Sequence, residues 1–543
     1  MIDIFRIYFA SPFIFLEMVI LSLFANIFAL ITPIFVILVF NRYVSSGVDA
    51  TLTTLSVGAL IAIIFEFLFR RARYHFAERL VEQRFIEQDA KIYDSITRAQ
   101  YLPIYSTEPS NLRTYFGMSD VLKNVYSPSN LSMFLDVPFA FLFIGAIYFI
   151  SPILSFITLF IIILTFILTF SFHLLLRKSV SDEQKIRTIR SQLVDTAIFS
   201  PATVRSFDTS GSQNSEWAKY ARIFQKVRNY VANRQNRIQT IVRSCSSFLT
   251  VIIITVGAMM VTNGALDIGA LIGINILAAR ALLPIIGLTQ QVENWARAKE
   301  ASRTVSNINK IPVVNPDGTG IEKESVGLEL RDVSFAYPFT HLPVFDRVNV
   351  SVGAGEILCV YGGNGAGKTT LAKMLCGLLE PTGGKIFVDG INLQQIAPKW
   401  WFNKIVYLPQ EPDFINDTFR NNFLIYNPDL GANDIHQLLG EVDLLSLVDE
   451  NPEGLDQKIR NNGRRLSLGV RRRLALARAL CHGGVLAILD EPTEGMDPKG
   501  ASTVYNLMNE LAKKKCTMVV FSHDKNIVRG AHHFLDLGES QRS

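Results

Sequence analysis

A glycine-rich stretch at 362–369, GGNGAGKT, has the residue types and the spacing of a loop that holds phosphate groups. It follows an apolar, strand-like run and opens a helical pattern, which is the context that the motif G-x-x-x-x-G-K-[ST] requires. Its glycines let backbone N–H groups surround phosphate oxygens, and the N-terminus of the next helix favours negative charge. Lys368 would reach the β- and γ-phosphates of a nucleotide, and the Thr369 hydroxyl would ligate Mg²⁺.

A pair of carboxylates ends a second apolar run, VLAILDE at 485–491, which we expect to form a buried strand. Asp490 would hold Mg²⁺ through water. Glu491 would then orient or deprotonate the attacking water. The alternative is a strand that happens to end in two acids, and the glycine-rich loop upstream argues against it.

Four further polar residues lie beside or at the ends of strand-like runs. They are Tyr337 in FAYP, Gln410 in YLPQ, Asp497 in EGMDP and His523 in MVVFSH. Each by itself fits an ordinary packing or loop role. Together, in this order, they resemble the ATPase domain of ABC transporters over 327–538.

That resemblance implies a role for each of the four residues. Tyr337 would stack on adenine, and Gln410 would touch Mg²⁺ and sense the membrane domain. Asp497 would bridge two ATPase subunits, and His523 would contact the γ-phosphate. The chain departs from the family at 494–497, where E-G-M-D replaces the usual S-x-L-D.

The segment LSLGV at 466–470 resembles the family's signature loop, LSGGQ, but differs from it at two letters. In the family geometry the Ser467 hydroxyl and the Gly469 N–H contact the nucleotide held by the other subunit, and both groups are present. We therefore expect a working, slow signature. The alternative is a plain helix cap at Ser467.

These motifs together define the predicted site, with ATP and Mg²⁺ as its expected cofactors. The predicted catalytic residues are Glu491 and His523, and the predicted Mg²⁺ contacts are Thr369, Gln410 and Asp490. The predicted nucleotide contacts are Tyr337, Gly362, Gly363, Asn364, Gly365, Ala366, Gly367, Lys368, Thr369, Thr370, Gln410, Ser467, Gly469 and Asp497.

The rest of the chain must position this site, and its apolar residues are unevenly spread. The chain has 543 residues, of which 49% are hydrophobic. Long apolar runs before about residue 290 give way to short segments after about residue 325, as in a membrane domain followed by an α/β P-loop ATPase domain. We predict a transmembrane domain at 1–309, a linker at 310–326 and a nucleotide-binding domain at 327–543.

The charge and the cysteine content of the chain limit which kinds of partner and which cellular compartment it requires. The net charge of +5 requires no nucleic-acid partner, because basic residues at membrane edges explain it. The five cysteines lack metal-ligand spacing and indicate free thiols in a reducing compartment.

Six candidate spans predict a helical membrane domain in the lipid bilayer. They lie at about 14–40, 51–69, 131–150, 153–176, 244–262 and 268–288. The long connections at 70–130 and 177–243 carry nine and thirteen Lys/Arg residues, whereas the short connections contain only Arg42. The positive-inside rule therefore predicts that both long connections and both termini are cytoplasmic.

Each long connection should form two helical extensions joined by a turn, which is the half-transporter pattern of ABC exporters. The turn-rich centres are 106–112 and 208–215, and we place the contacts with the ATPase domain there.

Four ionisable residues fall within or beside the predicted spans: Glu17, Glu66, Asp136 and Arg280. The three acids lie near cytoplasmic span ends and can reach water. Arg280 is in mid-span, so it faces either an aqueous cavity or an interhelical partner.

Three stretches of the membrane half resemble a narrower family, the ABC component of bacterial type I secretion systems. They are PIFVILVFNRYVSSG, DVPFAFLFIGAIYF and AARALLPIIGLTQQVENWARAKEA. At 41–43 the letters N-R-Y replace the more usual Y-D-R. The first span begins near residue 14, so we expect no peptidase domain before it and no trimming of a cargo leader.

The resemblance implies ATP-driven export of an unfolded polypeptide across the bacterial inner membrane by a dimer of half-transporters, preferably a homodimer. Its partners would be a periplasmic adaptor protein and an outer-membrane channel. The alternatives are a lipid, drug or small-peptide exporter and, less favoured, a membrane regulator driven by ATP hydrolysis that transports nothing.

Overall fold

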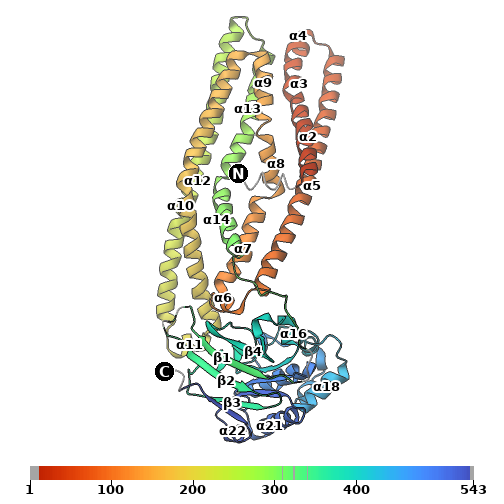
Figure 1. Ribbon diagram of the computed structural model, residues 1–543. Coiled ribbons are helices and arrows are strands. Elements are labelled where there is room, and N and C mark those ends of the chain that lie inside the picture. The colour runs from red at the N-terminus through yellow and green to blue at the C-terminus, as the bar shows by residue number, and fades with distance from the viewer. Residues whose placement is uncertain (1–10, 309, 322–324, 339, 341, 539–543) are drawn as a thin grey trace. The chain divides into compact units, whose positions relative to one another are not determined.

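The computed structural model describes residues 11–308, 310–321, 325–338, 340 and 342–538, without the side chains of 46, 169–170, 172–180, 289–290 and 292–293. The chain divides into two compact units. The first, helical unit comprises the residues up to 98 and 106–312, and the second unit comprises 99–105 and the residues from 313 onward (Figure 1). The predicted linker at 310–326 includes 322–324, which lie outside the described residues.

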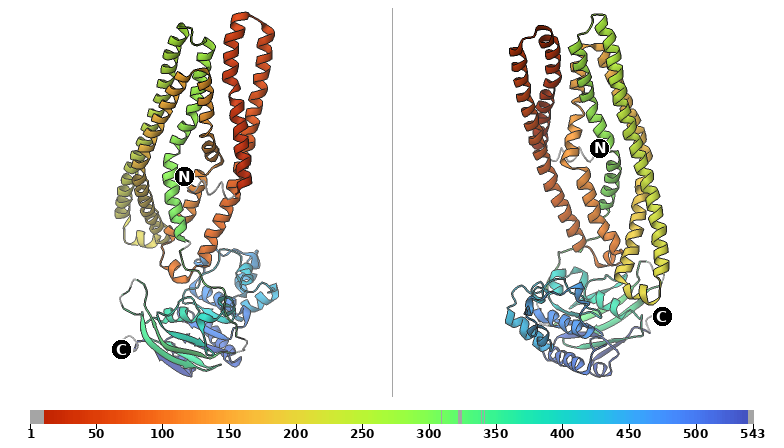
Figure 2. Two further views of the ribbon diagram at one scale, coloured as in Figure 1. Left: turned by 45° about the horizontal axis from the view of Figure 1, so that its top comes forward. Right: turned by 180° about the vertical axis from the view of Figure 1, so that it is seen from behind.

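The helical unit is built from long helices, and α5, α10 and α12 are each more than twice as long as the roughly 20 residues that cross a membrane. Its elements are α2 (Pro12–Ala29), α3 (Ile31–Leu38), the π-helical turn η1 (Val39–Tyr43), α4 (Val44–Ser46), α5 (Asp49–Thr97), α7 (Pro109–Val125), α8 (Pro128–Asp136), α9 (Ala140–Ile150), α10 (Pro152–Phe199), α11 (Pro201–Ser206), α12 (Ser210–Thr262), α13 (Ile268–Gln290) and α14 (Val292–Ile308). Helices α10 and α12 pack side by side (Figures 1 and 2).

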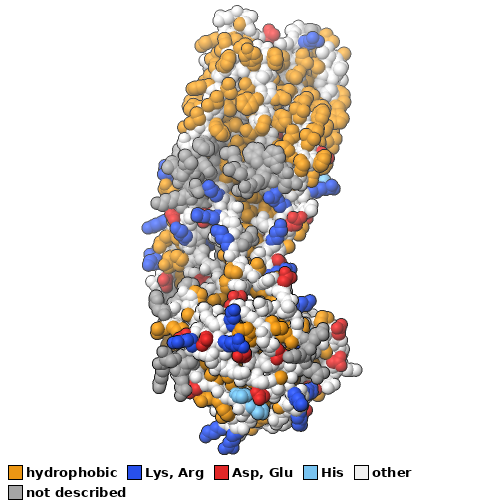
Figure 3. Space-filling model, viewed as in Figure 1, with side chains coloured by type: hydrophobic (Ala, Val, Ile, Leu, Met, Phe, Trp, Pro, Cys, Tyr) orange, Lys and Arg blue, Asp and Glu red, His pale blue; other side chains and the backbone are white. Residues whose placement is uncertain are grey.

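Within the described residues, five helical segments are long and apolar enough to cross a membrane. They are Pro12–Tyr43, Asp49–Thr97, Pro128–Ile150, Ser210–Thr262 and Ile268–Leu288. The described apolar part of α10, Pro152–Leu168, is shorter. The predicted span at 153–176 continues beyond it into side chains outside the described part of the chain. Hydrophobic side chains cover the upper part of the helical unit in Figure 3, as lipid contact requires.

The third predicted span, 131–150, is divided between α8 and α9. The helices separate at 137–139, where Pro138 lacks the N–H that a continuous helix would use. The span is therefore bent by its own sequence, and Asp136 lies just before the break.

Both long polar connections form two helical extensions, as predicted, and a short helix precedes the turn that joins them. The first joining helix is α6 (Tyr101–Tyr105), which belongs to the second unit. Tyr101 and Leu102 pack against the core of that unit, and the Lys373 ammonium lies 5.3 Å from the Tyr101 ring centroid. The predicted contact segment at 106–112 belongs to the helical unit instead. The contacts with the ATPase domain that the sequence predicts at 106–112 and 208–215 stay predictions.

The second unit contains two sheets. Strands β1 (Leu328–Phe335), β2 (Phe345–Val352), β4 (Gly383–Val388) and β5 (Ile391–Asn392) form an antiparallel sheet in the order β2-β1-β4-β5. Strands β3 (Ile357–Tyr361), β6 (Ile405–Leu408), β7 (Leu486–Asp490), β8 (Thr517–Phe521) and β9 (His533–Asp536) form a parallel sheet in the order β6-β7-β8-β3-β9. Every residue of β7 and β8 is buried, as continuous apolar runs in a parallel sheet require.

The helices of the second unit surround these sheets and complete two hydrophobic cores. They are α15 (Lys368–Leu375), α16 (Pro398–Phe402), α17 (Phe419–Leu424), α18 (Ala432–Glu441), α19 (Leu445–Asp449), α20 (Leu468–Ala479), α21 (Pro498–Lys513) and α22 (Lys525–Arg529), with short 3₁₀ turns between them. Because the five parallel strands point the same way, the segments that follow them emerge at one edge of the sheet.

Candidate functional site

The carboxyl ends of four parallel strands bring the predicted site residues to one edge of the sheet. The glycine-rich loop at 362–369 follows β3, and Gln410 follows β6. Asp490 ends β7 with Glu491 next in the chain, and His523 follows β8. Ligands of open α/β sheets bind at this edge, so the topology alone makes these residues neighbours.

The backbone of the glycine-rich loop depends on glycine at two positions. Gly365 has φ +85° and Gly367 has φ +95°, a region that other residues rarely adopt. A Cβ on Gly367 would also lie 2.6 Å from Cγ1 of Val344. Gly367 is the N-cap of α15, so the loop turns directly into a helix N-terminus whose free N–H groups favour an anion.

Lys368 is the point where the loop meets the two predicted catalytic residues. Its Nζ donates to the Gly362 carbonyl oxygen at 2.9 Å and lies 2.7 Å from Nε2 of His523. The same Nζ lies 3.3 Å from Oε1 of Glu491. The Lys368 ammonium group therefore contacts the loop, the Glu491 carboxylate and the His523 imidazole at the place where phosphate oxygens would bind.

Asp490 is a carboxylate buried at the end of β7. It is 1% exposed, and neither of its oxygens accepts a hydrogen bond from the described residues. Burial raises the pKa of Asp490 above its ordinary value, and the nearby Thr369 hydroxyl offsets part of this rise without satisfying either oxygen. Unpaired buried carboxylate oxygens are costly unless a cation binds them.

The donor set around Asp490 fits Mg²⁺, a hard cation that takes oxygen ligands. Thr369 Oγ1 lies 3.5 Å from Oε1 of Gln410, so hydroxyl and amide oxygens accompany the carboxylate. The described residues contain no cluster of three His, Cys, Asp or Glu side chains that could hold a metal. A magnesium ion here would therefore complete its coordination with phosphate and water oxygens, as it usually does.

Glu491 has an unusual backbone conformation at the end of β7. Its φ is +46°, in the left-handed region that costs free energy for a residue with a side chain. The Glu491 N–H donates to the Phe521 carbonyl oxygen at 2.9 Å, which anchors this turn to β8. The strained turn fixes the carboxylate beside Lys368, and such strain commonly marks functional sites.

The signature segment begins α20, and Ser467 is the N-cap of that helix. Ser467 Oγ accepts from the Val470 N–H at 3.3 Å, while the side chain remains exposed. A Cβ on Gly469 would meet no atom within 4 Å outside its own stretch of helix. Val470 packs against the core instead of presenting a polar group. The structure therefore contains the helix cap, and the phosphate contacts of Ser467 and Gly469 stay predictions.

Asp497 and Tyr337 both have structural partners within the second unit. Asp497 is the N-cap of α21, and its Oδ1 accepts from the Gly500 N–H at 3.1 Å. The Tyr337 hydroxyl lies 3.2 Å from Thr370 Oγ1, and its ring packs edge-on against Phe335 with centroids 5.0 Å apart. Tyr337 is therefore tied to the helix that follows the glycine-rich loop. Adenine stacking and subunit bridging remain predictions for these two residues.

Arg472 and Glu494, neither of which was predicted to belong to the site, connect three parts of it. Arg472 is 1% exposed, and its guanidinium donates to the Gln410 carbonyl oxygen from Nε at 3.0 Å and from Nη2 at 2.9 Å. It also binds the Glu494 backbone oxygen and, at 3.2 Å, the Glu494 carboxylate. Gln410 Nε2 donates to the same carboxylate at 3.2 Å. The sequence did indicate that Arg472 lies on a buried helix face, because apolar residues follow it at helical spacings of three, four and seven.

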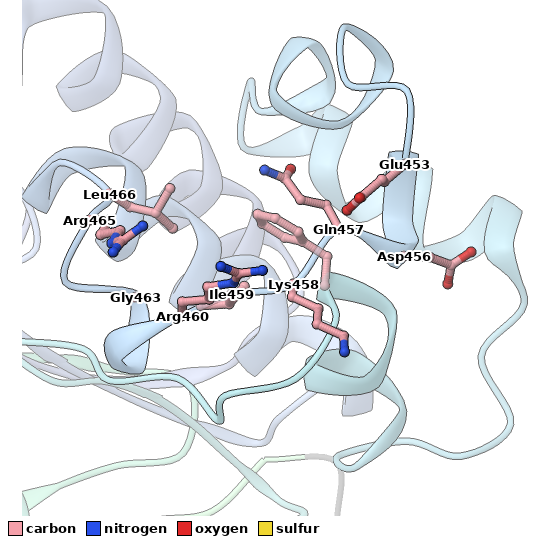
Figure 4. Close-up of a pocket in the computed structure, with 10 residues that line it drawn as sticks. Glu453, Asp456, Gln457, Lys458, Ile459, Arg460, Gly463, Arg465 and Leu466 are labelled. Carbon is pink, nitrogen blue, oxygen red and sulfur yellow. The ribbon is translucent and has the colours of Figure 1, made fainter.

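A surface cavity of about 710 Å³ lies next to the signature segment (Figure 4). Its lining residues are Phe419, Glu453, Asp456, Gln457, Lys458, Ile459, Arg460, Gly463, Arg465 and Leu466. It contains no residue of the glycine-rich loop or of the strand ends that follow β6, β7 and β8. The cavity is therefore separate from the candidate phosphate site.

Comparison with protein families gives two matches that together cover most of the chain. Residues 15–283 match the ABC transporter transmembrane region, and residues 345–494 match the ABC transporter family.

Individual relatives and a solved structure agree with these matches. The chain is 25% identical over 539 residues to the leukotoxin export ATP-binding protein LtxB of Aggregatibacter actinomycetemcomitans, covering 97% of this chain and 75% of that protein. It is 24% identical over 530 residues to the alpha-hemolysin translocation ATP-binding protein HlyB of Escherichia coli, covering 96% and 74%. A bacterial Atm1-family ABC exporter with ATP bound has the same fold, with a TM-score of 0.85, 15% identity, and coverage of 97% and 95%.

Proposed function

The chain belongs to the ABC transporter family, and from that premise we propose that it exports an unfolded polypeptide as the ABC component of a type I secretion system. It is a multi-pass bacterial membrane protein whose ATPase domain hydrolyses ATP to drive export. The proposal concerns what is exported and with which partners.

One observation favours a polypeptide over other classes of cargo. The similarity to proteins named for the export of leukotoxin and alpha-hemolysin extends over nearly the whole chain, including the membrane half. A third relative, the toxin RTX-I translocation ATP-binding protein of Actinobacillus pleuropneumoniae, is 24% identical over 97% of this chain and 75% of its own length. In this proposal the membrane half contacts the cargo, so similarity there supports a shared cargo class.

The geometry of the nucleotide site supports a distinct role for each of its residues. In the proposed mechanism the glycine-rich loop and Lys368 bind and orient the β- and γ-phosphates. Glu491 orients the attacking water and accepts its proton, while His523 contacts the γ-phosphate. Thr369, Gln410 and Asp490 would hold Mg²⁺, which neutralises charge on the phosphates when bound.

Two copies of the chain would complete each site. In a homodimer, ATP bound to the loop of one subunit would also contact Ser467 and Gly469 of the other. The free N–H groups at the start of α20 suit a phosphate. Asp497, at the start of α21, would bridge the subunits.

The membrane arrangement in this proposal follows the distribution of Lys and Arg. The basic connections at 70–130 and 177–243, and both termini, lie in the cytoplasm. We retain 310–326 as the linker and 327–543 as the nucleotide-binding domain. A periplasmic adaptor and an outer-membrane channel would carry the cargo onward.

Comparison of secreted proteins tests the proposed cargo class. The gene is deleted in its host, and the deletion strain is complemented with the wild type, Glu491→Gln or the surface control Lys514→Gln. The extracellular proteins are then compared by mass spectrometry. We expect at least one polypeptide to disappear from the medium on deletion and to return with the wild type and Lys514→Gln only. Unchanged extracellular proteins together with a lost lipid or drug efflux would contradict the proposal.

A further inference from the structure

A cavity of about 360 Å³ in the helical unit is lined by residues of α2, α5, α8, α9 and α13. Its polar and charged lining residues include Asn26, Arg70, Arg73, Ser132, Asp136 and Arg280. We propose that this cavity binds carboxylate groups of the exported polypeptide, an inference that rests on the proposed function and names a recognition element for it.

The cavity has a cationic surplus within helices that contain membrane spans. The guanidinium groups of Arg70, Arg73 and Arg280 face two carboxylates, those of Glu66 and Asp136, which pair with them. Charged side chains at membrane depth are costly and persist where they pair or line a polar cavity. One positive charge is left over in this cluster, so an added anion would balance it.

Two buried polar groups in the lining have no partner. Arg73 is 5% exposed, and its two terminal nitrogens bind both oxygens of Asp136, yet its Nε has no partner among the described residues. The Ser132 hydroxyl, 7% exposed as a residue, is also unpaired in the described part of the chain. Buried unpaired groups are rare and costly, and a ligand that brings acceptor oxygens would satisfy both.

Of the other two arginines, Arg280 makes only long contacts, whereas Arg70 makes one hydrogen bond of ordinary length. Arg280 Nη1 lies 3.6 Å from Oε1 of Glu66, and Arg280 Nη2 lies 3.4 Å from the Thr32 hydroxyl. Arg70 binds the same Glu66 oxygen through Nε, and its side chain is 39% exposed. Arg280 therefore has an interhelical partner and also lines a cavity, so both alternatives raised by the sequence apply. Its long contacts leave N–H groups that an incoming carboxylate can take.

The chemistry of the lining favours an acidic peptide over an anionic lipid. Guanidinium groups bind carboxylates through paired N–H donors, as Arg73 already binds Asp136. Ser132 and Asn26 can pair with a polar peptide backbone beside the acidic side chain. A phospholipid would need a continuous apolar groove for its acyl chains, whereas four charged side chains, those of Arg70, Arg73, Asp136 and Arg280, line this cavity.

A binding measurement with matched peptides tests the proposal on the full-length protein in phosphatidylcholine nanodiscs. The probes are two fluorescent, unstructured peptides that differ only in having glutamate or glutamine at the same positions, and anisotropy reports binding. We expect the glutamate peptide to bind about tenfold more tightly, because it gains a charge-assisted hydrogen bond. Arg280→Gln should abolish this preference and Arg280→Lys should keep part of it. The exposed-arginine control Arg222→Gln on α12 should leave it unchanged.

A second variant separates recognition from folding. Ser132→Ala removes a hydroxyl that makes no hydrogen bond in the described structure, so folding should survive while both peptides bind more weakly. Equal binding of the two peptides by the wild type would overturn the carboxylate site but leave polypeptide export standing. A glutamate preference that vanishes when phosphatidylglycerol replaces phosphatidylcholine would assign the cavity to lipid and overturn the proposal. Failure of polypeptide export itself would show instead in the extracellular proteins of the deletion strain.

Discussion

Lys368 and Glu491 form an ion pair in the second unit, with Nζ of the lysine 3.3 Å from Oε1 of the glutamate. Both side chains are largely buried, at 11% and 13% exposure. Phosphate oxygens that engage the lysine would compete for this contact and free the carboxylate to orient water. The pair therefore connects phosphate binding by the loop with activation of the nucleophile.

The buried carboxylate of Asp490 should lower the stability of the protein without nucleotide, although ATPase activity should require it. Burial raises the pKa of Asp490, so the folded state holds its proton more firmly than the unfolded state. Stability therefore falls as the pH rises from the ordinary pKa of 3.8 through the raised value, and at neutral pH the full penalty is present. Asp490→Asn should stabilise the protein without nucleotide by about 1–3 kcal/mol at pH 7, and it should abolish ATPase activity.

Thermal unfolding in detergent, followed from acidic to neutral pH, measures this effect. The stability advantage of Asp490→Asn should shrink as the pH falls toward the ordinary pKa. An asparagine variant that is less stable than the wild type at neutral pH would contradict the account of the orphaned carboxylate.

Arg472 should matter for stability as well as for activity. Arg472→Ala leaves the Gln410 carbonyl oxygen without its charged donors, and we expect a loss of roughly 1–3 kcal/mol. Glu494 is half exposed, so water compensates for the loss of its own partner. The matched control is Arg464→Ala, at an exposed position near the start of the same helix. Unchanged unfolding temperatures for Arg472→Ala, measured by scanning fluorimetry, would show that the network contributes nothing.

Substitutions at Ser467 separate helix capping from ligand contact. Ser467→Gly keeps most of the capping free energy, losing only a few tenths of a kcal/mol, whereas Ser467→Ala loses about 1 kcal/mol. If the hydroxyl contacts phosphate, both variants should hydrolyse ATP slowly although only the alanine variant is destabilised. A glycine variant with full activity would reduce Ser467 to a cap.

Gly469 provides an independent test of the same segment. A Cβ at this position would meet no atom within 4 Å outside its own stretch of helix, so Gly469→Asp should fold. Its carboxylate would repel the nucleotide of the partner subunit, and steady-state phosphate release should fall by about 10²-fold or more. Gly469→Ala is the uncharged control and should lose much less. Intact hydrolysis by the aspartate variant would exclude a phosphate contact here.

Thiol labelling tests the membrane arrangement. With Cys245 replaced by serine, a cysteine at Asn263 should react with an impermeant reagent outside intact cells, and one at Ser210 should react only after permeabilisation. Burial raises the pKa of Cys359, Cys481 and Cys516 to about 11, so these thiols give little background at neutral pH. Labelling of Ser210→Cys from outside would reverse the orientation.

The sequence was informative where the signal is local. The glycine-rich loop requires a strand before it and a helix after it, and the structure has β3 and α15 there. The apolar run before Asp490 forms a fully buried strand for the same reason. Such features depend on residues close together in the chain, so their periodicity and spacing predict them.

Contacts between segments that are distant in the chain could not be predicted from periodicity and spacing. The packing of α6 depends on which apolar residues meet the core of the second unit, and turn residues nearby gave the more visible signal. The pairing of Arg280 with Glu66 joins helices more than two hundred residues apart. The lack of a hydrogen-bond partner for Asp490 within the described part of the chain depends on everything that surrounds this side chain, which one sequence does not contain.

Hydrolysis by Glu491→Gln tests the central claim most directly, that Glu491 activates the water which attacks ATP bound at the strand ends. The purified variant is compared with the wild type and with Glu510→Gln, which alters an exposed surface pair. We predict that Glu491→Gln binds ATP normally while its turnover falls by about 10²-fold or more, because phosphate contacts survive and general-base catalysis does not. Near-normal phosphate release by this variant, with Glu510→Gln also unchanged, would contradict the account.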